Sequence, residues 1–372
     1  MRTPWRTLGG PGRVGALAVL LVLVLALAGV GLGSGVVVAS SAHGQGDRPV
    51  GLVQAGNSKT SCIYVGGGSV NPQLRGAEQA TGMTWNCLEV FVDADPTWSQ
   101  WVDPWITHAD SGVPGWVRSQ QRRRTLIVSA ELIPQSISNN ADPLTWEEPC
   151  DQGSFDGYAR QLARALVAAG EGYSVVRLGM EMNGGWEQDY MGQTLAEQHA
   201  WATCFAREVT AMRAVKGSHL LFDWNVNACT NDYPLASFYP GNAYVDVVGI
   251  DIYDEDCARP LGTPSATTWH QLLTEPLGLA ALTQFARTHR KPMSIPEWGV
   301  LASSPGGGAD PYYVSGMASW VATHHVAFES YFDSASNGVL PLGSKSPQVL
   351  AAYRRGFGPS GTVARALSAL SR

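Results

Sequence analysis

Charged residues are scarce in this sequence, and their scarcity excludes several classes of protein. Only 15% of the 372 residues are Asp, Glu, Lys or Arg, and the formal net charge is −6. No basic patch is available for a phosphate backbone, so we expect no nucleic-acid partner. The 13 Trp and 12 Tyr residues, within a composition that is 45% hydrophobic, also argue against an intrinsically disordered chain.

Several familiar active-site motifs are missing as well. The sequence contains no Cys-x-x-Cys pair, and its eight His residues are scattered, so we expect no metal site and no cofactor. No Gly-x-Ser-x-Gly segment stands between a strand and a helix, which argues against a Ser/His/Asp hydrolase. The sequence also shows no internal repeat and no long linker.

The N-terminal residues have the composition of an export signal. Three arginines precede an apolar run from Val14 to Val30, and small residues suited to cleavage follow at Ser40–Ala42. We predict a signal peptide over residues 1–42, with an uncleaved membrane anchor as the alternative. Residues 43–60 are expected to form a flexible lead-in, and the protein is expected to be secreted.

Six cysteines follow the export signal, and an even number in an exported chain predicts three disulfides. The sequence alone does not fix their connectivity, because six cysteines can pair in many ways. If the strands lie where they are placed below, neighbouring strands and loops favour three pairs: Cys62–Cys87, Cys229–Cys257 and, from the two that remain, Cys150–Cys204.

Short β-rich runs alternate with helical stretches between residues 61 and 358. Eight runs have the composition of strands: Ile63–Val65, Cys87–Val92, Leu126–Ala130, Val175–Met180, Leu220–Trp224, Val245–Ile252, Pro292–Pro296 and Val326–Tyr331. Helical periodicity is clearest at 154–170, 194–217 and 347–357. This alternation predicts an α/β protein with a single (β/α)8 TIM barrel over residues 61–358, followed by a tail at 359–372. A doubly wound open sheet is the alternative, although a glycine-rich turn leading into a helix is lacking after the first strand.

Two glutamates stand at the ends of predicted strands. Glu181 follows the fourth strand and Glu297 the seventh, and such barrels carry their active residues at the C-terminal ends of the strands. Because side chains alternate along a strand, Arg177 should share a face with Glu181, and Asp251 with Tyr253. Met293 and Ile295 should likewise share the face of Glu297. A pair of carboxyl groups across one barrel mouth is what glycoside hydrolysis requires.

The segments around these residues resemble glycoside hydrolase family 26, a family of (β/α)8 enzymes that includes β-mannanases. RLGMEMNGGW, at Arg177–Trp186, is similar to the acid/base motif of that family, and YPGNAYVDVVGIDIYD, at Tyr239–Asp254, looks like its sixth-strand region. The glutamate of PEWG, at Pro296–Gly299, stands where the nucleophile belongs. The resemblance implies that Glu181 is the acid/base and Glu297 the nucleophile.

The remaining candidate site residues are expected to bind the substrate. They are Arg177, Asn183, Trp186, Asp251, Tyr253 and Trp298. Asn225 and Asn227 are further candidates for hydrogen bonds to sugar, and Glu131 is the best placed of the other acids.

The sequence therefore predicts a secreted glycoside hydrolase that cleaves β-linked polysaccharide by a retaining double displacement, with endo action favoured. It departs from the family at Met180, where well-studied members have histidine, and this leaves the sugar open. A β-glucanase or β-xylanase on the same barrel is one alternative, and a catalytically silent glycan-binding barrel is another. Neither the linkage nor the oligomeric state can be deduced from the sequence.

Overall fold

Eight parallel strands close into a barrel in the order of the sequence, and β8 pairs with β1. Their bounds are Thr60–Tyr64 (β1), Cys87–Phe91 (β2), Thr125–Ala130 (β3), Val175–Leu178 (β4), Leu221–Asn227 (β5), Val247–Tyr253 (β6), Met293–Gly299 (β7) and Val326–Phe332 (β8). The predicted (β/α)8 barrel is confirmed, and the open doubly wound sheet is excluded.

The computed structural model describes residues 60–92, 97–119, 124–230, 233–254, 257, 263–302, 308–335, 338–342 and 346–370. All of these lie in one compact unit that spans Asp47–Arg372. The predicted signal peptide or anchor and nearly all of the predicted lead-in fall outside the described residues. Within the described part of the chain, no helix combines the length and the apolar character needed to cross a membrane.

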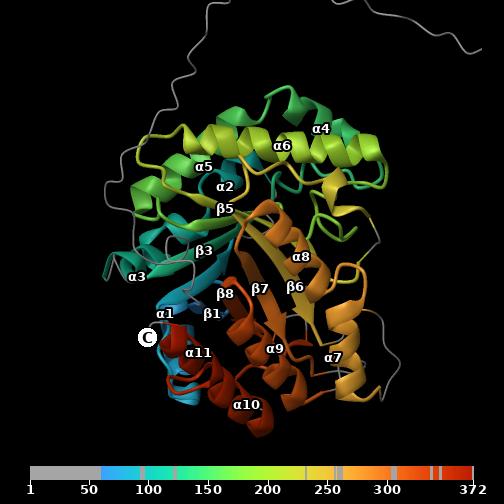
Figure 1. The fold of residues 1–372 in the computed structure, drawn as a ribbon. Helices are drawn as coiled ribbons and strands as arrows, with labels where there is room; N and C mark the ends of the chain where they lie inside the picture. The colour runs from blue at the N-terminus through green and yellow to red at the C-terminus, as the bar shows by residue number, and fades with distance from the viewer. Residues whose placement is uncertain are drawn as a thin grey trace, which may run out of the picture. The chain divides into compact units, whose positions relative to one another are not determined.

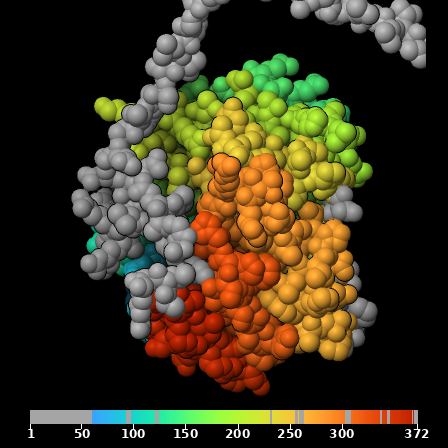
Figure 2. Space-filling model, in the orientation of Figure 1, coloured from blue at the N-terminus to red at the C-terminus, as the bar shows by residue number. Residues whose placement is uncertain are grey.

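Helices surround the barrel and cover its wall (Figure 1). Figure 2 shows the molecular surface in the same orientation. The α-helices are Val70–Thr81 (α1), Trp98–Trp101 (α2), Val113–Ser119 (α3), Leu144–Asp151 (α4), Asp156–Ala169 (α5), Leu195–Arg213 (α6), Ser265–Thr274 (α7), Leu279–His289 (α8), Pro311–Thr323 (α9), Pro347–Phe357 (α10) and Thr362–Leu370 (α11). Short 3-10 helices span Trp105–Thr107 (η1), Ala109–Ser111 (η2) and Leu235–Ser237 (η3). The segment expected to be a C-terminal tail contains α11, which packs against α9.

Local signals in the sequence account for the ends of the longest helix and its neighbour. Thr194 accepts a hydrogen bond from the backbone of Glu197, and the Glu197 side chain bonds back to Thr194, so α6 begins with a capping box. Gly170 adopts a left-handed conformation and ends α5. Helix α5 begins at Asp156, two residues after the start of the expected helical stretch, and Phe155 occupies its N-cap position.

The three favoured disulfides are all present, and two of them join the neighbouring strands and the loops that the sequence suggested. Cys62–Cys87 links β1 to β2, and Cys150–Cys204 links α4 to α6. Cys229–Cys257 joins the segments after β5 and β6. A disulfide removes conformational freedom from the unfolded chain, so these bonds stabilise the barrel and its loops.

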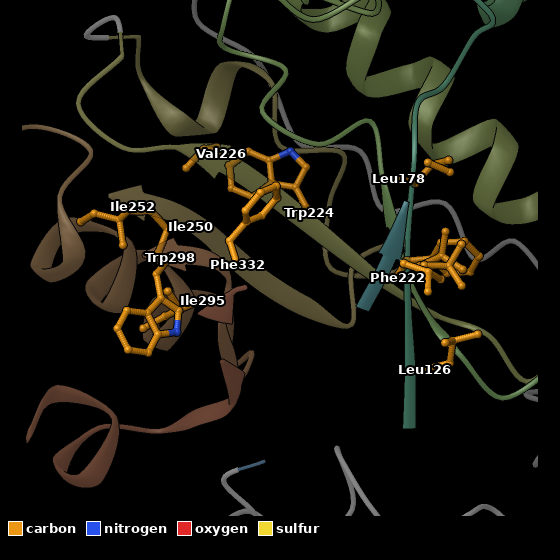
Figure 3. Packing of buried hydrophobic residues seen from close by; sticks show 14 of the residues in the cluster. Leu126, Leu178, Phe222, Trp224, Val226, Ile250, Ile252, Ile295, Trp298 and Phe332 are labelled. Carbon is orange, nitrogen blue, oxygen red and sulfur yellow. The ribbon is translucent and has the colours of Figure 1, made fainter. Parts of the chain in front are cut away.

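The barrel wall and its lumen are filled by different kinds of side chain. Large apolar groups pack between the strands and the surrounding helices (Figure 3). A smaller apolar cluster contains side chains near the N-terminal ends of the strands, including Cys62, Ile127 and Val175. Two residues further along β3 and β4, the side chains are polar Ser129 and charged Arg177, because the strand alternation returns to the same face. The lumen therefore becomes polar toward the end where the active residues were expected.

The seventh strand corrects one prediction about side-chain direction. Ser294 bonds to Asp223, and the pairing of β7 with β8 shifts register between Ile295 and Trp298. Ile295 and Trp298 lie together in the apolar cluster of Figure 3, whereas Glu297 bonds to Arg177. The expectation that Ile295 shares a face with Glu297 is therefore wrong, and the irregularity of β7 explains why.

Candidate active site

Arg177 on β4 organises the charged layer of the lumen. Its guanidinium group is fully buried and donates to Glu89 on β2 at 2.6 Å, to Asp251 on β6 at 2.5 Å and to Glu297 on β7 at 3.0 Å. It also donates to Asn225 on β5 at 2.7 Å. With a further bond to Ser129 on β3 at 2.9 Å, this one cation contacts side chains from five other strands and fixes their positions relative to β4. A buried charge is tolerated only with such partners.

Both carboxyl oxygens of Glu297 accept hydrogen bonds from fixed side chains. One carboxylate oxygen accepts from Arg177, and the other accepts from the Tyr253 hydroxyl at 2.9 Å. The backbone N–H of Glu297 donates to Asp251 at 2.8 Å, which fixes the main chain beside the carboxylate. Donors to both oxygens stabilise the negative charge. Such a carboxylate is suited to act as a nucleophile rather than as an acid.

Glu181 lies in a different environment, just beyond the end of β4. Its backbone has a positive φ of 50°, and its N–H donates to the carbonyl of Asn225 at 3.0 Å. One carboxyl oxygen accepts from Asn227 at 2.8 Å, and the other accepts from the Trp186 indole at 2.9 Å. Burial, followed by the negative charge of Glu297, raises the pKa of Glu181. The two carboxyl groups are thus within electrostatic range, and the environment of Glu181 favours its protonated form.

The structure brings most, but not all, of the expected site residues together. Arg177, Asp251, Tyr253 and Glu297 form one network, and Glu181 and Trp186 form a second contact beside it. Trp186 is 59% exposed, which leaves its ring accessible to a ligand.

Two expected substrate contacts lie elsewhere. Trp298 is fully buried, donates to Glu329 at 2.6 Å and packs against Tyr331 and Phe357 outside the lumen. Asn183 is also fully buried, so neither side chain has exposed surface for a sugar.

Asn183 instead ties the loop after β4 to the end of β5. Its amide nitrogen donates to the carbonyls of Asn227 and Thr230 at 2.9 and 2.8 Å. Its amide oxygen accepts from the backbone N–H of Asn227 at 2.9 Å. These bonds fix the residue whose side chain holds Glu181, so Asn183 acts on the site through Asn227.

Sequence reasoning missed Glu89 and undervalued Asn227. Glu89 is fully buried in the lumen and accepts from Ser129 at 2.9 Å as well as from Arg177. Burial raises its pKa to about 7, although the Arg177 charge opposes that shift. The available signal was strand alternation, because Glu89 lies two residues after Cys87 on the lumen side of β2. Asn227 lies two residues after Asn225 in the same way.

The comparisons with known proteins agree with this geometry. Residues 168–297 match the family model described as glycosyl hydrolase family 26, and both glutamates fall within the matched segment. The match agrees with the resemblance seen in the sequence motifs. No curated protein matches the chain.

Solved structures show the same fold at low sequence identity. A family 26 β-mannanase from Bacteroides ovatus is 13% identical with a TM-score of 0.60, covering 82% of this chain and 90% of its own. A Bacillus subtilis mannanase is 14% identical with a TM-score of 0.55, covering 79% and 84%. A modular endo-β-1,4-mannanase from Cellulomonas fimi is 15% identical with a TM-score of 0.58, covering 80% and 70%.

Proposed function

We propose that this chain, a glycoside hydrolase whose residues 168–297 match family 26, cleaves β-linked polysaccharide with retention of anomeric configuration. The observation that carries the proposal is the contrast between the two carboxyl groups. Donors stabilise the charge on both oxygens of Glu297, whereas burial and the neighbouring charge raise the pKa of Glu181. Opposite environments for two facing acids separate a nucleophile from a proton donor.

The reaction follows from these assignments in two steps. The Glu297 carboxylate attacks the anomeric carbon while Glu181 gives its proton to the glycosidic oxygen, so the glycosidic bond breaks and a glycosyl-enzyme forms. Glu181, now ionised, removes a proton from water. The water oxygen then attacks the anomeric carbon and displaces Glu297, and the Glu181 proton is restored.

Our favoured substrate is a β-mannan, with endo action. The similar solved structures named above are mannanases, and the exposed Trp186 ring offers a face on which a sugar can stack. Met180, where family members have histidine, is buried and contributes only a weak acceptor, so a β-glucan or β-xylan is the second candidate. Three disulfides suit an oxidising compartment, which supports secretion, with anchoring through residues 1–42 as the alternative.

A panel of mannan, xylan, β-1,3-glucan and mixed-linkage glucan, assayed for released reducing ends, tests this function. We expect one of them to be hydrolysed by the wild type and not detectably by Glu181→Gln or Glu297→Gln. Proton NMR of the first product should show the β-anomer, as retention requires. Binding of a glycan without hydrolysis would establish the silent barrel, and release of the α-anomer would establish inversion.

A further inference from the structure

The two oxygens of Glu181 are held in different ways. The first accepts from Asn227, whose amide orientation is fixed because its own oxygen accepts from the Thr230 hydroxyl. Asn227 is also buried and tied to Asn183 through its backbone. The second oxygen accepts from the Trp186 indole at 2.9 Å. Asn227, which is fixed by buried contacts, therefore occupies one oxygen of Glu181. The other oxygen, which is bonded to the exposed Trp186 indole, is the one available to a substrate.

The Trp186 ring has few contacts and is largely exposed to solvent. It is 59% exposed, and it makes no ring–ring contact with the aromatic residues that the structure describes. The ring lies directly over Gly184, where a Cβ atom would approach the indole carbons to 2.5 Å. No such restriction exists at Gly185, where a Cβ atom would meet nothing within 4 Å. The indole N–H bond to Glu181 and the bare backbone of Gly184 together define where the ring rests.

We propose that the Trp186 indole N–H is a removable partner of Glu181 that stabilises the carboxylate form in the free enzyme and leaves when a sugar occupies the leaving-group side. The inference rests on the proposed function. An N–H donor stabilises an ionised carboxylate, so its departure favours uptake of a proton from solvent. That proton passes to the glycosidic oxygen as the bond to the anomeric carbon breaks and Glu297 bonds to that carbon. Trp186 is thus a positioning residue that couples binding to protonation.

The other charged groups around Glu181 do not couple sugar binding to its protonation. Most of these groups are fixed in position by the strands or by buried contacts. The titratable and charged groups in electrostatic range come from β4, β6, β7 and the loop after β4: Arg177, Asp251, Tyr253, Glu297 and Glu187. The first four are tied into the network around Arg177. Of the two side chains that donate to Glu181, Asn227 is buried and Trp186 is exposed.

The first test measures the titration of Glu181 in the free protein by carbon-13 NMR, with the resonance assigned by Glu181→Gln. Trp186→Phe keeps a ring but lacks the N–H, and Gly184→Ala keeps the N–H but displaces the ring. Both should raise the pKa of Glu181 by about half a pH unit or more. Gly185→Ala is the matched control and should leave it unchanged. An unaltered titration in Trp186→Phe and Gly184→Ala would overturn the inference.

The second test compares the pH profiles of kcat and kcat/KM on the polysaccharide that the wild type hydrolyses. Because kcat/KM reports the free enzyme and kcat the complex, the alkaline limb of kcat should lie at higher pH in the wild type. In Trp186→Phe the alkaline limbs of the kcat and kcat/KM profiles should lie closer together in pH than in the wild type. Coincident limbs in the wild type would show that the indole stays in place. If no polysaccharide is hydrolysed, the proposed function fails, while the NMR titration still decides whether the indole controls Glu181.

Discussion

At the scale of the residue, Arg177 combines two tasks in one side chain. It neutralises part of the charge of three acids in the lumen, and it donates to the oxygen of Glu297 that Tyr253 does not contact. Burying a cation of this kind costs free energy, which is offset only when its hydrogen-bond partners are in place. Stability and catalysis therefore depend on the same contacts, and one substitution should affect both.

Arg177→Met should strongly destabilise the protein, because it leaves Glu89 and Asp251 buried without their charge partner. We expect the free energy of unfolding to fall by about 3–5 kcal/mol, measured by urea denaturation at neutral pH. The control is Arg207→Met, whose ion pair with Asp156 is partly exposed and should contribute about 1 kcal/mol or less. Equal losses in the two variants would contradict this account of the lumen.

The site residues that could be predicted are those within short motifs or simple alternation. Glu181 and Glu297 lie in recognisable motifs, and Arg177 shares a strand face with the site. Trp298 was expected at the site although it follows Glu297 directly, and strand alternation places such a neighbour on the opposite face, where the structure buries it. Asn183 was expected to bind sugar because a side-chain amide can hydrogen-bond either to a sugar hydroxyl or to the protein backbone. Only the packed loops show that its hydrogen bonds are already used.

At the scale of the element, the existence of each strand was easier to predict than its end. The fourth strand was expected to reach Met180 but ends at Leu178, because Gly179 and Glu181 both have positive φ values. A side chain at Gly179 would approach Trp201 to 2.8 Å, so the turn also depends on packing against α6. The fifth strand extends beyond its expected end at Trp224 to Asn227. Neither end is visible in hydrophobic periodicity.

The helix α6 offers a test at this scale. Thr194→Ala removes the capping hydrogen bond to the backbone of Glu197 and should lower the free energy of unfolding by about 1 kcal/mol. Thermal and urea unfolding would measure the change. Thr203→Ala is the matched control, because this exposed hydroxyl bonds only to a carbonyl of its own helix and its removal should have a smaller effect. A larger loss at Thr203 would argue against the capping box.

At the scale of the whole molecule, eight alternating strands and helices were sufficient to predict closure into a barrel, and the cysteines were sufficient to predict three cross-links. What the sequence concealed is the number of acids buried outside the lumen network. Glu147, Glu171 and Glu208 are buried on helices or loops, and burial raises the pKa of each. Their positions depend on how helices pack around the barrel, which no local pattern specifies.

These buried acids should make the molecule less stable as the pH rises. Glu147 on α4 is fully buried, and neither carboxyl oxygen has a hydrogen-bond partner among the described residues. Burial, with the charges of Glu197 and Asp189, raises its pKa to about 9, against an ordinary value of 4.5. A raised pKa means that the folded state holds the proton more tightly. The contribution of protonated Glu147 to the free energy of unfolding is therefore fully present below about pH 4.5 and is lost as the pH rises toward 9.

We therefore expect Glu147→Gln, which keeps the shape but cannot ionise, to flatten the fall in unfolding free energy between pH 5 and pH 9. At pH 8 the variant should be more stable than the wild type by about 4–5 kcal/mol, because its unfolded chain gains nothing by releasing a proton. Urea denaturation across this pH range measures the difference. Glu148→Gln, at the exposed neighbouring position on α4, should leave the profile unchanged. A wild type that becomes more stable from pH 5 to pH 8, with no response to Glu147→Gln, would show that Glu147 is ionised in the folded protein.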